Sequence, residues 1–146
     1  MGGHRVVSTG VILAGAGLAV SPLLPWAGLR ADMPVLGRGI GTSVIGFDDA
    51  AGWFVCAAGL LAAALGVAGV TRGRAFTAFA VVPGAAATLA LAVFINRPER
   101  LLDLSVTIAG LVRVHPRIEY GWFVGLGASV LISLLAAITL FRRRHA

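Results

Sequence analysis

Four long stretches of this sequence contain no charged residue, and they limit the possible folds more than any other feature. They cover about residues 6–24, 50–70, 76–95 and 120–141. A helix needs about 20 apolar residues to cross a bilayer core about 30 Å thick, and segments without Asp, Glu, Lys or Arg enter lipid at little cost. The chain is 58% hydrophobic and 12% charged, which is outside the range of soluble globular domains. We therefore predict one all-α membrane domain, residues 1–146, with four transmembrane helices.

The arginines predict the orientation of these helices. All 12 basic residues are arginine, and six of them lie in segments without any acid: Arg5, Arg72, Arg74 and Arg142 to Arg144. The six acids all lie in the two long connections, residues 25–49 and 96–119, together with the other arginines. Because short basic loops stay in the cytoplasm, we expect both termini to be cytoplasmic and both long loops to be outside a bacterial plasma membrane. The basic ends would then face anionic lipid headgroups, and nucleic-acid binding is disfavoured because no soluble basic domain exists.

The tetrapeptide GWFV occurs twice, at residues 52–55 and 121–124, each time where an apolar stretch begins. The chain thus divides into two tandem units of helix, long outer loop, GWFV and helix. Tryptophan is enriched at the headgroup level of membranes, so we predict Trp53 and Trp122, with Trp26 after the first helix, to be interfacial anchors. Chance recurrence of GWFV in so biased a composition is the alternative.

Small residues recur at every fourth position of the last helix: Gly121, Gly125, Ser129 and Ser133. Such a ladder allows another helix to approach closely, because packing drives helix association in lipid. Two interpretations are open, namely packing within the four-helix bundle and a contact face for a partner protein. The first is the more common use of such a ladder, and these four residues are also our candidates for packing against a partner helix. In the third helix, Pro83 removes a backbone hydrogen bond and predicts a kink.

Both outer loops show strand patterns. Apolar and polar residues alternate from Leu102 to Ala109, which is the period of a strand with one covered face. Residues 111–118 could form a return strand whose end is disturbed by Pro116, and residues 42–47 could form another short strand. We expect a small extracytoplasmic β-rich cap. Four helices below an outer sheet resemble the claudin layout, although the paired loop cysteines of that group are missing.

Catalytic or cofactor chemistry has little support in the sequence. Cys56 is the only cysteine, which excludes an intramolecular disulfide. The histidines lie at the two termini and at His115, a spacing that does not indicate a metal site. Asp48 and Asp49 precede a helix, where a capping role is more common than acid–base or cation chemistry. No phosphate loop, dinucleotide fingerprint or HExxH motif occurs. We therefore expect a protein that is not an enzyme and has no cofactor or metal.

An accessory or assembly subunit of a larger inner-membrane complex is the function that remains. The absence of lysine and the abundance of Arg, Ala, Gly and Val indicate a GC-rich, actinobacterial genome. In layout, from the first helix to the Arg142–Arg144 tail, the chain resembles the four-helix accessory subunit of mycobacterial Mce-type lipid importers, also called the lipid uptake coordinator. The resemblance implies permease and ATPase subunits as partners. The alternative is a small homo-oligomeric channel or carrier, although the helices lack the ionisable groups that pumps and coupled carriers keep inside the membrane.

Overall fold

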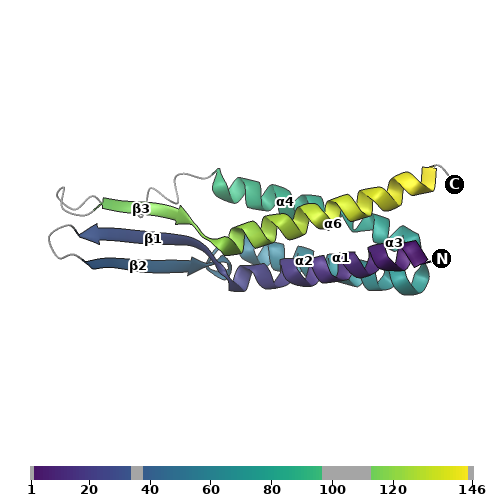
Figure 1. Cartoon of the computed structure of the whole chain (residues 1–146), viewed down its shortest axis with the longest axis horizontal. Helices are drawn as coiled ribbons and strands as arrows, with labels where there is room; N and C mark the ends of the chain where they lie inside the picture. The colour runs from purple at the N-terminus through teal and green to yellow at the C-terminus, as the bar shows by residue number, and fades with distance from the viewer. Residues whose placement is uncertain (1, 34–37, 97–112, 145–146) are drawn as a thin grey trace.

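The computed structural model describes residues 2–33, 38–96 and 113–144 and contains four long apolar helical spans (Figure 1). The first is α1 (Gly2–Val20) and the second is α2 (Ala50–Arg72). The third is divided into α3 (Arg74–Phe79) and α4 (Val81–Ile95), and the fourth is α6 (Tyr120–Arg144). Each span is long and apolar enough to cross a membrane, which confirms the four predicted helices.

Two local features of the sequence shape the third span. Gly73 alone separates α2 from α3, at a φ of 119° that a residue with a Cβ rarely adopts. The break between α3 and α4 lies at Ala80, one turn before Pro83. Proline has no N–H to donate to the carbonyl of Phe79, and its ring crowds that carbonyl. The helix is therefore interrupted where a kink was predicted, on the N-terminal side of the proline.

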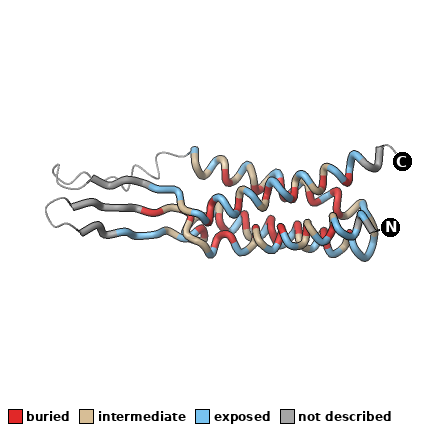
Figure 2. Tube along the Cα trace, viewed as in Figure 1, coloured by how far each residue is buried: buried red, intermediate tan, exposed pale blue. Residues whose placement is uncertain are grey.

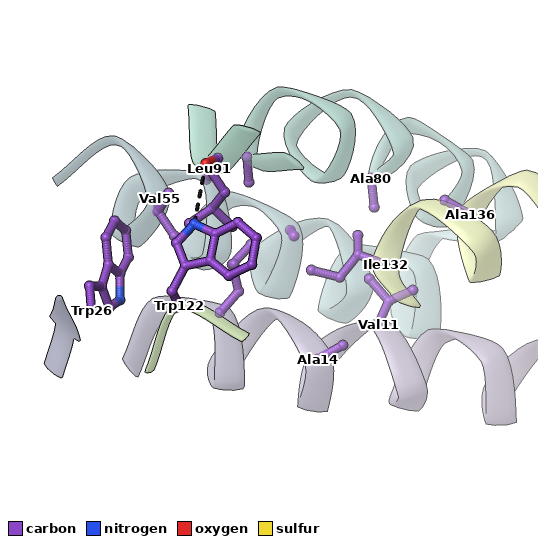
Figure 3. Close-up of a cluster of buried hydrophobic side chains, with 13 residues drawn as sticks. Val11, Ala14, Trp26, Val55, Ala80, Leu91, Trp122, Ile132 and Ala136 are labelled. Atoms are coloured by element: carbon purple, nitrogen blue, oxygen red, sulfur yellow. Dashed lines mark hydrogen bonds between the residues drawn. The ribbon is translucent and has the colours of Figure 1, made fainter. Parts of the chain in front are cut away.

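The helices form an antiparallel bundle in which α1 and α4 each pack between α2 and α6. Buried residues line the inner faces of the helices, and exposed residues lie on the outside (Figure 2). The core is built from Val11, Leu18, Val55, Leu91, Ile132 and several alanines, with Trp26 and Trp122 at one end (Figure 3). Many large apolar side chains stay exposed on the outer surface, such as Leu60, Leu89 and Leu134. A bundle with this surface is compatible with a surrounding lipid phase.

A three-stranded antiparallel sheet extends from one end of the bundle, opposite to both chain termini (Figure 1). Its strands are β1 (Pro25–Met33), β2 (Arg38–Ile45) and β3 (Arg113–Ile118), in the order β2-β1-β3. Two short 3-10 helices, η1 (Ser21–Leu23) and η2 (Gly46–Asp48), connect the sheet to α1 and α2.

The sheet confirms the predicted β-rich cap in outline and changes its details. The strand expected at residues 42–47 is the end of a longer β2, and the return strand is β3. The strand expected from Leu102 to Ala109 lies outside the described residues. The long β1 was not predicted. Pro116 lies inside β3 rather than disturbing its end, which is tolerated where the missing N–H is not needed for pairing with a neighbour.

Candidate interaction surface

The strand register divides the sheet into an apolar and a polar face. Residues directly opposite each other in neighbouring strands share a face, and successive residues alternate between faces. Ala27 pairs with Val44 and Ile118, and Leu29 pairs with Thr42 and Pro116. Ala31 continues this face with Ile40 and Val114. Eight of the nine positions are apolar and the ninth is threonine, so we call this face the apolar sheet face.

The opposite side, the polar sheet face, holds every charged residue of the same six rows. The three rows contain Gly28 between Ser43 and Arg117, Arg30 between Gly41 and His115, and Asp32 between Gly39 and Arg113. On this face Ser43 and Arg117 are exposed. The two faces of the sheet therefore differ sharply in chemistry.

Trp26 fixes the base of the sheet to the helices. Its side chain is only 1% exposed, its Nε1 donates to the carbonyl of Ser21 at 2.9 Å, and its ring meets that of Phe94 edge-on at 5.4 Å. A Cβ at Gly46 would lie 2.6 Å from the indole, so glycine is needed there. The N–H of Glu119, just before α6, donates to the Trp26 carbonyl at 3.0 Å. The ends or connections of all four spans thus meet at this tryptophan.

The three predicted interfacial anchors have different environments. Trp53 is 65% exposed, as an anchor requires, and its ring contacts Phe47 at 4.7 Å. Trp26 and Trp122 are instead buried, and Trp122 donates its Nε1 hydrogen to the Leu91 carbonyl at 3.2 Å (Figure 3). For these two the anchor prediction needs correction, because their rings fill the core where the sheet meets the bundle. The two GWFV copies do begin α2 and α6, but their tryptophans are not equivalent.

The small-residue ladder of α6 is occupied by the chain itself. A Cβ at Gly121 would lie 2.6 Å from Leu24 Cβ, and one at Gly125 would lie 2.9 Å from Ser21 Oγ. Ser129 is fully buried, with its Oγ 3.0 Å from Thr88 Oγ1 on α4. Ser133 continues the same contact, because a Cβ at Gly84 would lie 2.8 Å from its Oγ. The prediction of a partner helix on this face is thus corrected, since α4 and the η1 region fill it.

Glycines also bring α1 and α2 into backbone contact. A Cβ at Gly15 would lie 2.7 Å from the Ala63 nitrogen, and one at Gly59 would lie 2.5 Å from the Ala19 nitrogen. A Cβ at Gly66 would lie 2.7 Å from Ile12 Cγ1. Small residues at such spacing are typical of close helix pairs in membranes. The glycines of both helices therefore serve the packing of the bundle.

The structure also describes the positions of the other residues that the sequence analysis considered for chemistry. Asp49 caps α2, because its side chain accepts from the Ala51 N–H at 2.8 Å, and Asp48 accepts from the Ile45 N–H at 3.2 Å. The capping interpretation is confirmed for Asp49. Cys56 is half-buried in α2. His115 pairs with Arg30 in the sheet. Within the described ranges, no group of three or more His, Cys, Asp or Glu residues could hold a metal ion.

The sequence alone does not reveal the two-faced sheet, because the residues of β1 give only a weak strand signal. Its alternation is present in the sequence, where Ala27, Leu29 and Ala31 are separated by Gly28 and Arg30. Alanine and glycine are weak strand formers, so the pattern stands out only beside its two neighbours. The register of all three strands was needed to recognise the apolar sheet face.

A scan against protein-family models finds no match to this chain, and a search of curated proteins finds no significant relative.

Proposed function

We propose that the chain is a non-catalytic accessory subunit of a larger inner-membrane complex and that it contacts its partner through the apolar sheet face. The observation that supports this proposal is a sheet with one apolar face, fixed by Trp26 beyond the end of a closely packed bundle. The inner surfaces of the helices pack against one another in the core of the bundle. The sheet and the outer surface of the bundle therefore remain for a partner.

The size of the apolar sheet face indicates what kind of partner it suits. Three strands about 4.8 Å apart and six paired rows at about 3.4 Å per residue give a footprint of about 300 Å². A stable interface buries about 800 Å² on each partner, so the sheet alone is too small. Exposed apolar residues continue from Ile118 at the base of β3 to Tyr120 and Phe123 in the first turn of α6. A partner that also spans the membrane can cover both regions.

The distribution of arginine supports an orientation for the complex. We place the sheet on the extracytoplasmic side and both termini in the cytoplasm, because the end opposite the sheet has purely basic connections. In this orientation the partner has an extracytoplasmic part beside the sheet and helices beside the bundle. The permease and ATPase subunits of an Mce-type lipid importer are our candidate partner, on the basis of the resemblance in layout.

Affinity purification with two matched variants tests this function. Thr42 and Ser43 are adjacent and exposed, but they belong to the apolar and the polar sheet face respectively. Full-length tagged protein carrying Thr42→Arg should lose permease and ATPase subunits from a mild-detergent purification, whereas Ser43→Arg should retain them. Gel filtration shows whether both variants stay folded. Equal retention by both would refute the apolar sheet face as the contact, and a wild-type protein that purifies without any stoichiometric partner would refute the accessory function.

The channel or carrier alternative gains no support from the bundle interior. Its middle is filled by Val11, Leu91 and Ile132, and the hydroxyl of Thr88 lies 2.9 Å from the Gly84 carbonyl as well as near Ser129. A conducting path would therefore have to form between copies. Flux through liposomes that contain only the purified protein would establish it.

A further inference from the structure

Three exposed arginines from three helices lie at the end of the bundle that is opposite the sheet. Arg5 is the fourth residue of α1, Arg72 is the last residue of α2, and Arg74 is the first residue of α3. The single-residue turn at Gly73 places Arg72 and Arg74 next to each other. Residues 2–31 and 50–96 contain no Asp or Glu. These three residues form what we call the arginine end.

A buried contact one turn deeper sets the three arginines at a common level. Ser8 Oγ and Thr77 Oγ1 are 2.8 Å apart and join α1 to α3. Both hydroxyls crowd the space above Gly69 of α2, where a Cβ would lie 3.1 Å from Ser8 Oγ. Ser8, Gly69 and Thr77 meet at this contact, one from each helix. The arginine of the same helix lies three residues nearer to the end of the bundle in each case. Three residues of helix are about 4.5 Å, so the three charged residues lie at similar height at one end of the bundle.

The distance along the helices matches the thickness of a membrane. Arg72 follows Trp53 by 19 residues of α2, which is about 28 Å at 1.5 Å per residue. A bilayer core is about 30 Å thick. With the exposed Trp53 in one headgroup layer, the arginine end lies in the other. The last turn of α6, with Arg142 to Arg144 in its sequence, ends on the same side (Figure 1).

From this geometry we infer that the arginine end is a binding site for anionic phospholipid headgroups. Guanidinium groups from three rigidly joined helices at this height can bind lipid headgroup phosphates while the acyl chains lie along the apolar outer surface of the bundle. The charge complementarity, the height and the apolar surface together specify a lipid rather than a soluble anion. The inference requires membrane insertion and does not depend on the proposed partner complex.

Native mass spectrometry of the full-length protein in mixed micelles tests this site. Phosphatidylglycerol should remain bound where phosphatidylcholine at the same concentration is lost. Each arginine near a membrane surface strengthens the binding of an anionic lipid about fivefold. Arg74→Gln should therefore weaken phosphatidylglycerol binding about fivefold, and the double variant with Arg72→Gln and Arg74→Gln about 25-fold. Arg117→Gln is the matched control, since Arg117 is an exposed arginine at the opposite, sheet end.

Three results would overturn the inference. Equal retention of the two lipids would show that charge does not select the ligand. An equal loss of binding in Arg117→Gln and Arg74→Gln would show that net charge alone is responsible. Displacement of the lipid by inorganic phosphate at the same concentration would show that the site takes a free anion instead. The substituted side chains are all exposed, and thermal unfolding of each variant checks that the fold is kept.

Discussion

Replacing Gly59 by alanine tests the close backbone approach of α2 to α1. The new Cβ would lie 2.5 Å from the Ala19 nitrogen and 2.8 Å from the Gly15 carbonyl oxygen, whereas ordinary contact begins at 3.4 Å. Both neighbours are backbone atoms, so no rotamer change relieves the overlap. The helices must separate by about 1 Å, and a gap of that size loses up to about half of the dispersion energy across it. We expect a steric cost of about 1–3 kcal/mol in the free energy of unfolding.

A second glycine separates this steric cost from the intrinsic helix preference of alanine. Gly17 lies in α1, the other helix of this pair, but a Cβ there would meet nothing within 4 Å. Both substitutions gain the same helix propensity, up to about 1 kcal/mol. The difference between their changes in the free energy of unfolding therefore measures the cost of the steric overlap at Gly59. Unfolding by dodecyl sulfate in mixed micelles, followed by circular dichroism, gives both free energies. If Gly59→Ala and Gly17→Ala agree within about 0.5 kcal/mol, the close approach of α1 to α2 is refuted.

Three further substitutions test other parts of the structure by the same unfolding measurement. Gly73→Ala should destabilise the protein by about 1–2 kcal/mol, because an L-residue is strained at its positive φ; unchanged stability would contradict this turn. Trp122→Phe should lower the free energy of unfolding by about 0.5–1.5 kcal/mol, because it removes the hydrogen bond to Leu91. Trp53→Phe, at an exposed position, should lower it by less than about 0.5 kcal/mol. The reverse order of the two effects would contradict the assigned burial. Asp49→Ala should cost about 0.5–2 kcal/mol through the lost N-cap of α2, and the capping role fails if Asp49→Asn and Asp49→Ala lower stability equally.

The internal use of the α6 ladder changes how variants of that helix should be interpreted. Gly125 and Ser129 contact η1 and α4 of the same chain, so bulky residues there disturb the bundle before they reach any partner. Loss of a partner in such a variant would not locate an interface. The sheet is the better place for that experiment, because Thr42 and Ser43 are exposed and tolerate change without repacking the core.

The sequence by itself determined the four long apolar helices, the break before Pro83 and the Asp49 cap. Insertion into lipid depends on the length and apolarity of each segment, and a kink or cap depends on a few neighbouring residues. These properties depend on residues that are near in sequence, so they can be predicted without knowing which other segments the helix contacts. Part of the β cap was predictable for the same reason, since the β-branched residues Thr42, Val44 and Ile45 mark the end of β2.

Only the tertiary structure decided which surfaces are free. The ladder at Ser129 and Ser133 has the same sequence pattern whether it meets α4 or a helix of another protein. Residues on both sides of such an apolar helix are mostly apolar or small, so hydropathy does not separate the inner face from the outer face. Trp26 and Trp53 likewise share a residue type, but one is in the core and the other is exposed. The apolar sheet face exists only when three strands align in register. Whether a side chain of this protein is buried depends on which other segment packs against it, and only the tertiary structure shows that packing.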